Sequence, residues 1–376
     1  MLRHYITKNG RTLRCGYTTG ACAAGAAGAA AEMLLTGTIV TVAHLDTPKG
    51  VPLTLDILEP ELGADFARCA IRKDSGDDPD VTNGVLVFAT ARRIAAGIAI
   101  DGGEGVGRVT KAGLDQPVGA AAINSVPRRM IEKQVEAACI KCGYAGGVGI
   151  TIAVPGGEAL AQRTFNPRLG IEGGISVIGT TGIVEPMSST ALVDTIKLEL
   201  SVRRAAGAKG VLLCPGNYGE TFAREALGLS AAGQVSTANF IGDAVDAAVA
   251  AGFERILLVG HIGKLVKLGI GARNTHSANG DGRMETLAAC ALASGADVPL
   301  LRRIMDCATT DAALAALDEA GLLEATMAAL GARIEATLRR WVPAGVEIGY
   351  ICFTNAGPRA GVLADSENAK AIAGKL

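Results

Sequence analysis

An acidic segment near the N-terminus carries the most unusual group of chemically capable side chains. Asp74, Asp77, Asp78 and Asp80 place four carboxylates within seven residues, directly after Lys73. Their spacing does not fit a calcium-binding EF-hand loop. Because clustered carboxylates repel one another, one of them could have a raised pKa and act as a base, or the group could attract a cationic ligand. The alternative is an acidic, solvated turn, which is the commoner outcome for an arbitrary sequence.

Three apolar runs in the second half of the chain, at 175–178, 210–214 and 255–259, end in loops that contain glycine. In open α/β sheets, ligands bind beyond the carboxyl ends of the strands, where glycine lets the backbone approach and helix N-termini offer free N–H donors. If the three strands are neighbours, their loops line one crevice for a nucleotide-like ligand. The alternative is that they are tight turns. The loop residues are Gly179, Thr180, Thr181, Gly182, Pro215, Gly216, Asn217, Gly260, His261, Gly263 and Lys264.

These loops do not identify the ligand by themselves. No G-x-G-x-x-G follows residue 178, which counts against a dinucleotide fingerprint, and the chain has no G-x-x-x-x-G-K-[ST] phosphate loop. Residues 214–217, Cys-Pro-Gly-Asn, stand where many nucleotide-binding sheets carry an acidic residue. The residues alone therefore indicate an enzyme with an adenosyl or phosphate ligand and leave the choice open.

A basic segment follows the third apolar run. Lys264, Lys267 and Arg273 lie on one segment, which is followed by Thr275 and His276. Together the three cations could form an edge that binds carboxylate groups. For His261 and His276, two of only four histidines, a hydrogen-bonded surface or capping role is the alternative.

The elements that must position these residues differ between the two halves of the chain. Residues 20–35 are rich in Ala and Gly and predict a tightly packed helix with Thr18 or Thr19 as its N-cap. Short β-rich runs follow, with one helix expected over 127–138. The first half therefore reads as an α+β domain.

In the second half, strands alternate with amphipathic helices, which is typical of a parallel, Rossmann-like sheet. Helices are expected over 188–206 and 239–251, and a late strand is expected over 346–354. We place an N-terminal α+β domain at 1–170 and a Rossmann-like α/β domain at 171–376.

Composition excludes several classes of protein. The 376 residues are 49% hydrophobic but only 3% aromatic, so the core must be built from Ala, Val, Ile and Leu. A net charge of −1 provides no general basic field for nucleic acid. The apolar run at 21–31 is shorter than the roughly 20 residues that span a bilayer, so no membrane association is expected. Nine cysteines, an odd number, indicate reduced thiols, and we expect a cytoplasmic enzyme.

Several motifs resemble those of the CbiD family. The N-terminal motif, Leu-Arg-Cys-Gly-Tyr-Thr-Thr-Gly-Ala-Cys-Ala-Ala, occupies residues 13–24. Further matches occur in chain order at 73–82, 164–171, 174–188, 263–267 and 275–277. Each is short, but together they extend to about residue 281. The resemblance implies a methyltransferase of anaerobic cobalamin biosynthesis, which uses S-adenosylmethionine to methylate carbon 1 of cobalt-precorrin-5B and gives cobalt-precorrin-6A.

For this reaction, the residues described above predict where the two ligands bind. S-adenosylmethionine is expected across the three glycine loops, and cobalt belongs to the corrinoid substrate, so no protein-bound metal is expected. Candidate substrate-binding residues are Lys73, Lys267, Arg273, Thr275 and His276. Candidate catalytic residues are Thr18, Thr19, Asp77 and Asp78. A non-catalytic tetrapyrrole or cobalt carrier, and another nucleotide-dependent enzyme of the same pathway, stay open as alternatives, as does assembly into a homo-oligomer.

Overall fold

The structure is a computed structural model that describes residues 2–8, 10–230, 233–357 and 359–376. The chain forms two compact units, Met1–Ser188 and Ser189–Leu376. Each unit has its own hydrophobic core, because no buried apolar cluster among the described residues contains side chains from both. Separate cores of this kind are the property that defines domains.

The division between the units lies C-terminal to the boundary expected at 170/171. Two short strand pairs explain the difference. β12 (Ile171–Glu172) pairs with β10 (Arg108–Val109), and β13 (Ile183–Val184) pairs with β3 (Gly16–Tyr17). The segment expected to begin the second domain is therefore hydrogen-bonded into the first unit.

A five-stranded sheet with the order β6-β7-β8-β11-β9 forms the base of the first unit. Its strands are β6 (Leu58–Leu62), β7 (Phe66–Arg72), β8 (Leu86–Ile94), β9 (Ile98–Gly102) and β11 (Gly147–Ala153). Neighbours run antiparallel except β9 and β11, which are parallel. Two hairpins accompany the sheet, β1 (Tyr5–Lys8) with β2 (Arg11–Arg14) and β4 (Val42–Asp46) with β5 (Pro52–Asp56). These mixed directions confirm the expected α+β architecture.

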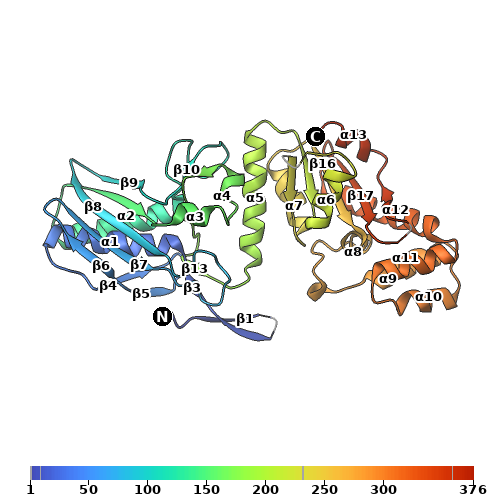
Figure 1. Ribbon diagram of the computed structural model, residues 1–376, viewed down its shortest axis with the longest axis horizontal. Coiled ribbons are helices and arrows are strands. Elements are labelled where there is room, and N and C mark those ends of the chain that lie inside the picture. The colour runs from blue at the N-terminus through green and yellow to red at the C-terminus, as the bar shows by residue number, and fades with distance from the viewer. Residues whose placement is uncertain (1, 9, 231–232, 358) are drawn as a thin grey trace. The chain divides into compact units, whose positions relative to one another are not determined.

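Helix α1 (Thr19–Thr36) is buried along most of its length and packs against α2 (Ser125–Lys141) and the sheet (Figure 1). The Thr18 hydroxyl accepts a hydrogen bond from the Ala21 N–H at 3.2 Å, which confirms the predicted N-cap. Small residues allow the close packing: a Cβ added at Gly25 would lie 2.8 Å from Ile71. Two short helices, α3 (Gly157–Ala161) and α4 (Asn166–Leu169), complete this unit's helical elements among the described residues.

The second unit contains a sheet with the order β15-β14-β16-β17-β18. Its strands are β14 (Gly210–Cys214), β15 (Gln234–Ser236), β16 (Arg255–His261), β17 (Glu347–Thr354) and β18 (Gly361–Asp365). The first four are parallel and β18 is antiparallel, which confirms the expected Rossmann-like alternation. The expectation that 175–178 begins this sheet is wrong. Ile175 and Val177 form only isolated bridges, with Val106 and Ile123 of the first unit.

Helices cover both faces of this parallel sheet (Figure 1). One face packs against α6 (Asn217–Glu225) and α13 (Ala369–Ala373). The other packs against α5 (Ser189–Ala205), α7 (Ile241–Ala250), α8 (Ile262–Leu265) and α12 (Leu323–Trp341). The remaining helical elements are η2 (Val266–Ile270), η3 (Ser277–Asn279), α9 (Arg283–Ala293), α10 (Val298–Met305) and α11 (Thr310–Glu319). A sheet buried on both faces leaves its strand ends as the accessible places for a ligand.

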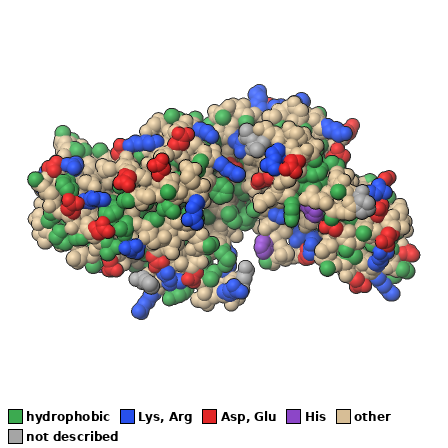
Figure 2. All heavy atoms as spheres, viewed as in Figure 1, with side chains coloured by type: hydrophobic (Ala, Val, Ile, Leu, Met, Phe, Trp, Pro, Cys, Tyr) green, Lys and Arg blue, Asp and Glu red, His purple; other side chains and the backbone are tan. Residues whose placement is uncertain are grey.

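Charged side chains of both signs are spread over the surface. On the face drawn in Figure 2, Lys and Arg side chains lie among Asp and Glu side chains over each unit. Such a mixture provides no extended basic field on this face for a phosphate backbone. None of the helices in the described part of the chain has both the length and the apolar character that crossing a bilayer requires.

Candidate functional site

The carboxyl edge of the parallel sheet forms the candidate site. Strands β14 and β16 are neighbours, but the chain leaves them toward opposite faces. After β14, Ala223 of α6 packs in the cluster on one face, whereas Ile262 and Leu265 of α8 pack in the cluster on the other. Loops that diverge in this way open a crevice between neighbouring parallel strands, where ligands bind. Residues 215–217 and 261–264 form this switch point, and we call this part of the edge the crevice.

Gly216 and Lys264 bring these two loops into contact. Gly216 has φ +96°, and a Cβ added there would lie 3.3 Å from Nζ of Lys264. The Lys264 ammonium donates a hydrogen bond to the Ala238 carbonyl at 3.0 Å, and no described carboxylate forms an ion pair with it. Burial lowers the pKa of Lys264, and repulsion by Lys267 lowers it further. The crevice therefore contains a partly desolvated cation that lacks an anionic partner within the described chain.

Glycine and proline fit the same two loops together. A Cβ added at Gly260 would lie 2.8 Å from Cγ of Pro215, so this position of β16 must be small for the loop after β14 to pack on it. Asn217 is the first residue of α6, and that helix has no side-chain hydrogen bond at its N-cap, Gly216. The first backbone N–H groups of α6 therefore have no competing capping side chain, and Gly216, which precedes them, lies close to Lys264.

His261 ends β16 at the same edge. Its Nδ1 accepts a hydrogen bond from the Gly263 N–H at 3.1 Å, so in the neutral ring the proton is on Nε2. Burial lowers the pKa of His261, although the nearby Asp311 carboxylate opposes this effect. The ring packs edge-on against Phe353, with centroids 5.6 Å apart, and lies 5.9 Å from the Tyr218 ring. His261 can thus present one neutral N–H donor.

A cavity of about 450 Å³ opens beside α8. It is lined by Asn239, Gly263, Lys264, Lys267, Thr275, His276, Ser277, Asp281 and Arg283. Five of the predicted ligand-binding residues therefore meet in one place. Arg283 donates to Asp281 from Nε at 2.6 Å and from Nη2 at 2.8 Å, and Lys267 lies 3.3 Å from the same carboxylate. Asp281 is thus shared by two of the three cations.

Two predicted residues form the wall of this cavity through contacts within the protein. Lys267 is 3% exposed and donates to the carbonyls of Thr275 at 3.2 Å and Gly280 at 3.4 Å. His276 accepts the Ala278 N–H on Nδ1 at 3.1 Å. These bonds hold the loop before α9 in shape.

Arg273, also predicted to bind substrate, lies outside the cavity lining. Its guanidinium forms an ion pair with Asp246, donates to the Gly242 carbonyl at 2.9 Å and lies 4.8 Å from the centre of the Trp341 ring. These contacts tie the segment after η2 to α7 and α12, so the charge of Arg273 is neutralised within the fold.

In the first unit, the acidic segment forms a hydrogen-bonded loop. Lys73 is 2% exposed, forms an ion pair with Asp80, and donates to the hydroxyls of Ser75 at 2.7 Å and Thr82 at 2.8 Å. Burial alone would raise the pKa of Asp80, but Lys73 and Thr82 together hold it below its ordinary value. Lys73 was expected to bind substrate, but its ammonium is buried and stabilises this loop instead.

The two candidate catalytic carboxylates are anchored by backbone groups. Asp77 accepts the Arg14 N–H on Oδ2 at 2.7 Å, and Asp78 accepts the Met187 N–H on Oδ1 at 2.9 Å. The Arg14 side chain is occupied by Asp74 through two bonds, at 2.6 and 2.8 Å, and these lower the pKa of Asp74. Asp77 is exposed and Asp78 is half-buried, so the carboxylate of Asp77 is the more accessible.

The loop at 179–182 closes over the start of α1. The Thr18 N–H donates to the Gly182 carbonyl at 3.0 Å, and a Cβ added at Gly179 would lie 2.2 Å from the Thr18 hydroxyl. Thr19 is buried, Thr180 is exposed, and the Thr181 hydroxyl bonds the backbone of Ile183. The expectation that this loop follows a strand of the same sheet as the other two is therefore wrong.

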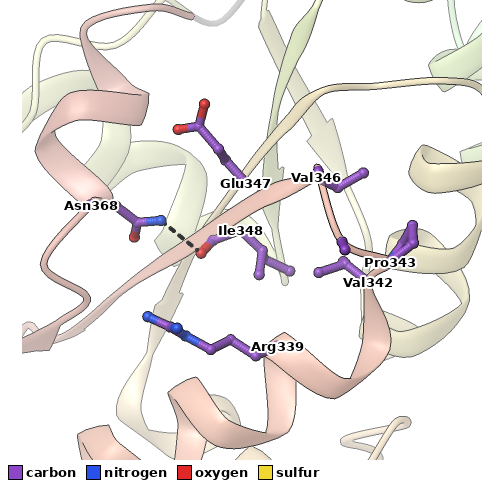
Figure 3. A pocket seen from close by; sticks show the side chains of 9 residues that line it. Arg339, Val342, Pro343, Val346, Glu347, Ile348 and Asn368 are labelled. Atoms are coloured by element: carbon purple, nitrogen blue, oxygen red, sulfur yellow. Dashed lines mark hydrogen bonds between the residues drawn. The ribbon is translucent and has the colours of Figure 1, made fainter.

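A second cavity, also of about 450 Å³, lies at the amino end of β17, between the end of α12 and the start of α13 (Figure 3). Asn368 uses both ends of its amide there, donating to the Ile348 carbonyl at 3.1 Å and accepting from the Ser366 hydroxyl at 2.8 Å. Arg339 forms an ion pair with Glu335. With Asn368 and Arg339 engaged in this way, and at the edge opposite the switch point, this cavity lacks the features of a ligand site.

Several polar residues at the site were not among the predicted ones. Thr354 ends β17 and donates to Asp311 at 2.7 Å, close to His261. A polar residue at the carboxyl end of an expected strand was the available signal for Thr354. Asn239 follows β15 in the same way, whereas Asp311 lies within a helix and no local pattern marks it. In the described chain, no three His, Cys, Asp or Glu side chains group together to hold a metal ion.

Comparisons with known proteins agree with the motifs. Residues 6–186 match the family model described as CbiD, and residues 274–362 match the model described as CbiD, C-terminal domain. Relatives named cobalt-precorrin-5B C(1)-methyltransferase include one from Ruminiclostridium cellulolyticum, 43% identical over 94% of this chain and 92% of its own length. One from Citrobacter koseri is 48% identical over 84% of this chain and 83% of its own length.

A solved structure is also similar. The crystal structure of the cobalamin biosynthesis protein CbiD from Archaeoglobus fulgidus is 30% identical, covers 74% of this chain and 87% of that chain, and aligns with a TM-score of 0.40. The family models and the curated relatives together cover most of this chain. The chain belongs to the CbiD family.

Proposed function

We propose that this protein is a C-methyltransferase that methylates carbon 1 of cobalt-precorrin-5B, giving cobalt-precorrin-6A in cobalamin biosynthesis, with S-adenosylmethionine as the methyl donor. One observation carries the proposal. Relatives named for this reaction are 43–48% identical over 84–94% of the chain. The glycine-lined crevice at the carboxyl edge of the parallel sheet supports an adenosyl ligand, because such switch points bind nucleotides.

The residues of the crevice fit the amino-acid part of this donor. Lys264 is a cation without an anionic partner among the described residues, and the uncapped N-terminus of α6 adds backbone donors beside it. Gly216 leaves open the space that a side chain would fill. We propose that the first N–H groups of α6 bind the donor carboxylate, with Lys264 and His261 Nε2–H available as further donors.

Alignment is the main catalytic contribution that this arrangement supplies. When bound, S-adenosylmethionine would supply a methyl group on a positively charged sulfur. The nucleophilic ring carbon attacks this methyl group in line, and S-adenosylhomocysteine is the leaving group. Holding two reactants in such a geometry is worth roughly 7–11 kcal/mol. Side chains fixed by several contacts suit that task, and His261 is held by Gly263 and Phe353.

A proton acceptor is the second contribution, and we assign it to Asp77. Its carboxylate is exposed, and one oxygen is anchored on the Arg14 N–H, which leaves the other free to accept a proton. Asp78 is anchored in the same manner but is less exposed, so it is the second choice. We assign Thr18, Thr19 and Lys73 to the fold. All three are buried, Thr18 accepts the N-cap hydrogen bond of α1, and Lys73 donates to Ser75 within its loop.

The direct test is methyl transfer to authentic substrate. The pure protein, incubated anaerobically with cobalt-precorrin-5B and isotopically labelled S-adenosylmethionine, should give a corrinoid that carries one labelled methyl group by mass spectrometry. Corrinoid binding without transfer, together with no affinity for S-adenosylhomocysteine by calorimetry, would instead indicate a carrier.

A further inference from the structure

The cavity beside α8 carries more positive charge than its own residues neutralise. Lys264, Lys267 and Arg283 line it, whereas Asp281 is the single carboxylate of the lining. Arg283 and Lys267 both contact Asp281, and Lys264 donates only to a neutral carbonyl. Partly desolvated cations are stabilised by an anion, so this imbalance indicates a ligand with negative charge.

Neutral donors line the same cavity as the unpaired cation. The Nδ1 atom of His276 accepts a backbone N–H, which leaves Nε2 of the neutral ring as a donor. Asn239 and Ser277 add an amide and a hydroxyl to the lining. One cation among several neutral donors is the arrangement that carboxylates bind in proteins, because each oxygen can accept more than one hydrogen bond.

We infer that this cavity is a carboxylate-binding subsite and that the Lys264 ammonium pairs directly with the bound carboxylate. The inference rests on the proposed function, which supplies two sources of this group, the amino-acid end of the methyl donor and the rim of the corrinoid. Lys264 lines the cavity and also contacts Gly216 of the crevice, so it can serve either source. Lys267 and Arg283 hold Asp281 and so shape the site around Lys264.

Ligands with and without a carboxylate separate the two sources. S-adenosylhomocysteine and 5′-methylthioadenosine, which lacks the amino-acid end, are titrated by calorimetry into wild type and Lys264→Met. A charge-assisted hydrogen bond is worth about 1.5–3 kcal/mol, which corresponds to a roughly 10- to 150-fold change in Kd. If the donor carboxylate binds here, Lys264→Met weakens S-adenosylhomocysteine by that factor and leaves 5′-methylthioadenosine unchanged. If the corrinoid carboxylate binds here, KM for cobalt-precorrin-5B rises instead, while kcat is kept.

Lys264→Arg and Lys370→Met are the matched variants. Lys264→Arg keeps a cation in the cavity and should restore much of the lost affinity. Lys370 is exposed on α13 and lines neither the cavity nor the crevice, so Lys370→Met removes the same charge from elsewhere on the second unit. Circular dichroism should show that all three variants are folded.

The outcomes distinguish this inference from the proposed function. If wild type transfers the methyl group and Lys264→Met changes the affinity for both ligands and KM no more than Lys370→Met does, the subsite is disproved and the function stands. If wild type transfers no methyl group, the function fails. The subsite is then judged by titrating cobalt-precorrin-5B by absorbance, where equal affinity of wild type and Lys264→Met overturns it.

Discussion

Burial disfavours the charged form of Lys264, so the free energy of unfolding of the protein should depend on pH. Its folded pKa lies below the ordinary value of 10.5, because of burial and then Lys267. Between the two values the unfolded chain binds more protons, so the free energy of unfolding rises with pH across that window. Lys264→Met lacks this dependence. Its stability advantage over wild type in urea titrations should therefore be largest at neutral pH and shrink toward pH 10.5. A difference that does not vary with pH would contradict the assignment.

Lys73 poses the opposite case, a buried cation that is fully paired. Asp80→Asn removes the negative charge and leaves the ammonium with neutral partners only, an amide oxygen and two hydroxyls. Lys73 is buried but Asp80 is partly exposed, so the loss should be smaller than the roughly 3–5 kcal/mol for a fully buried pair, and the melting temperature should still fall. Asp65→Asn is the control, because its ion pair with Arg92 is exposed and should cost little. Equal melting temperatures for the two variants would show that Lys73 does not depend on Asp80.

Asp77 is predicted to act in the reaction and not in the fold. Asp77→Asn keeps an amide oxygen that can accept the Arg14 N–H, so the loop should keep its anchor. The amide cannot take a proton, and kcat should fall by roughly 10²–10⁴-fold with little change in melting temperature or in donor Kd. Steady-state kinetics and thermal unfolding of the same preparation decide the matter. Wild-type kcat with a lowered melting temperature would assign Asp77 to the loop instead.

At the scale of elements, the crevice depends on close packing between the loop after β14 and the loop after β16. Gly216→Ala adds backbone strain at φ +96° and also a Cβ that displaces the Lys264 ammonium. Gly295→Ala is the matched control, since Gly295 has φ +94° with nothing within 4 Å of an added Cβ. Both variants should lose about 1–3 kcal/mol of stability from strain. Only Gly216→Ala should also weaken S-adenosylhomocysteine in calorimetry, and equal affinities would place the donor elsewhere.

Local pattern predicted the elements whose partners are decided locally. Helix α1 carries its own N-cap, Thr18, and the alternation from β14 to β16 contains the periodicities of strand and helix in turn. The run at 175–178 shows the limit of this reasoning. It is apolar and followed by glycine, but its β-bridge partners, Val106 and Ile123, lie far away in sequence. Which sheet such a run joins is decided by packing that the run itself does not contain.

The candidate site divides in the same way. Gly216, His261 and Lys264 could be predicted because strand ends in parallel sheets are ligand sites whatever the rest of the chain does. The contacts of Arg273 with Asp246 and Trp341 could not be predicted. In sequence, a basic residue that binds a ligand cannot be distinguished from one whose charge is paired within the protein. The Thr354–Asp311 bond likewise joins two residues from separate elements.

At the scale of the whole molecule, the two cores predict independent folding. The cluster from Cys15 to Ile183 lies within Met1–Ser188, and the clusters from Ile196 onward lie within Ser189–Leu376. Units with separate cores can fold alone. Each fragment, expressed separately, should therefore show a cooperative thermal transition by circular dichroism.

The crevice and the cavity both lie in the second fragment, so that fragment should bind S-adenosylhomocysteine with a Kd close to that of the full chain. The first fragment should not bind it. Neither fragment alone should transfer a methyl group, because Asp77 belongs to the first. A folded second fragment without affinity for S-adenosylhomocysteine would show that the donor site needs residues of the first unit.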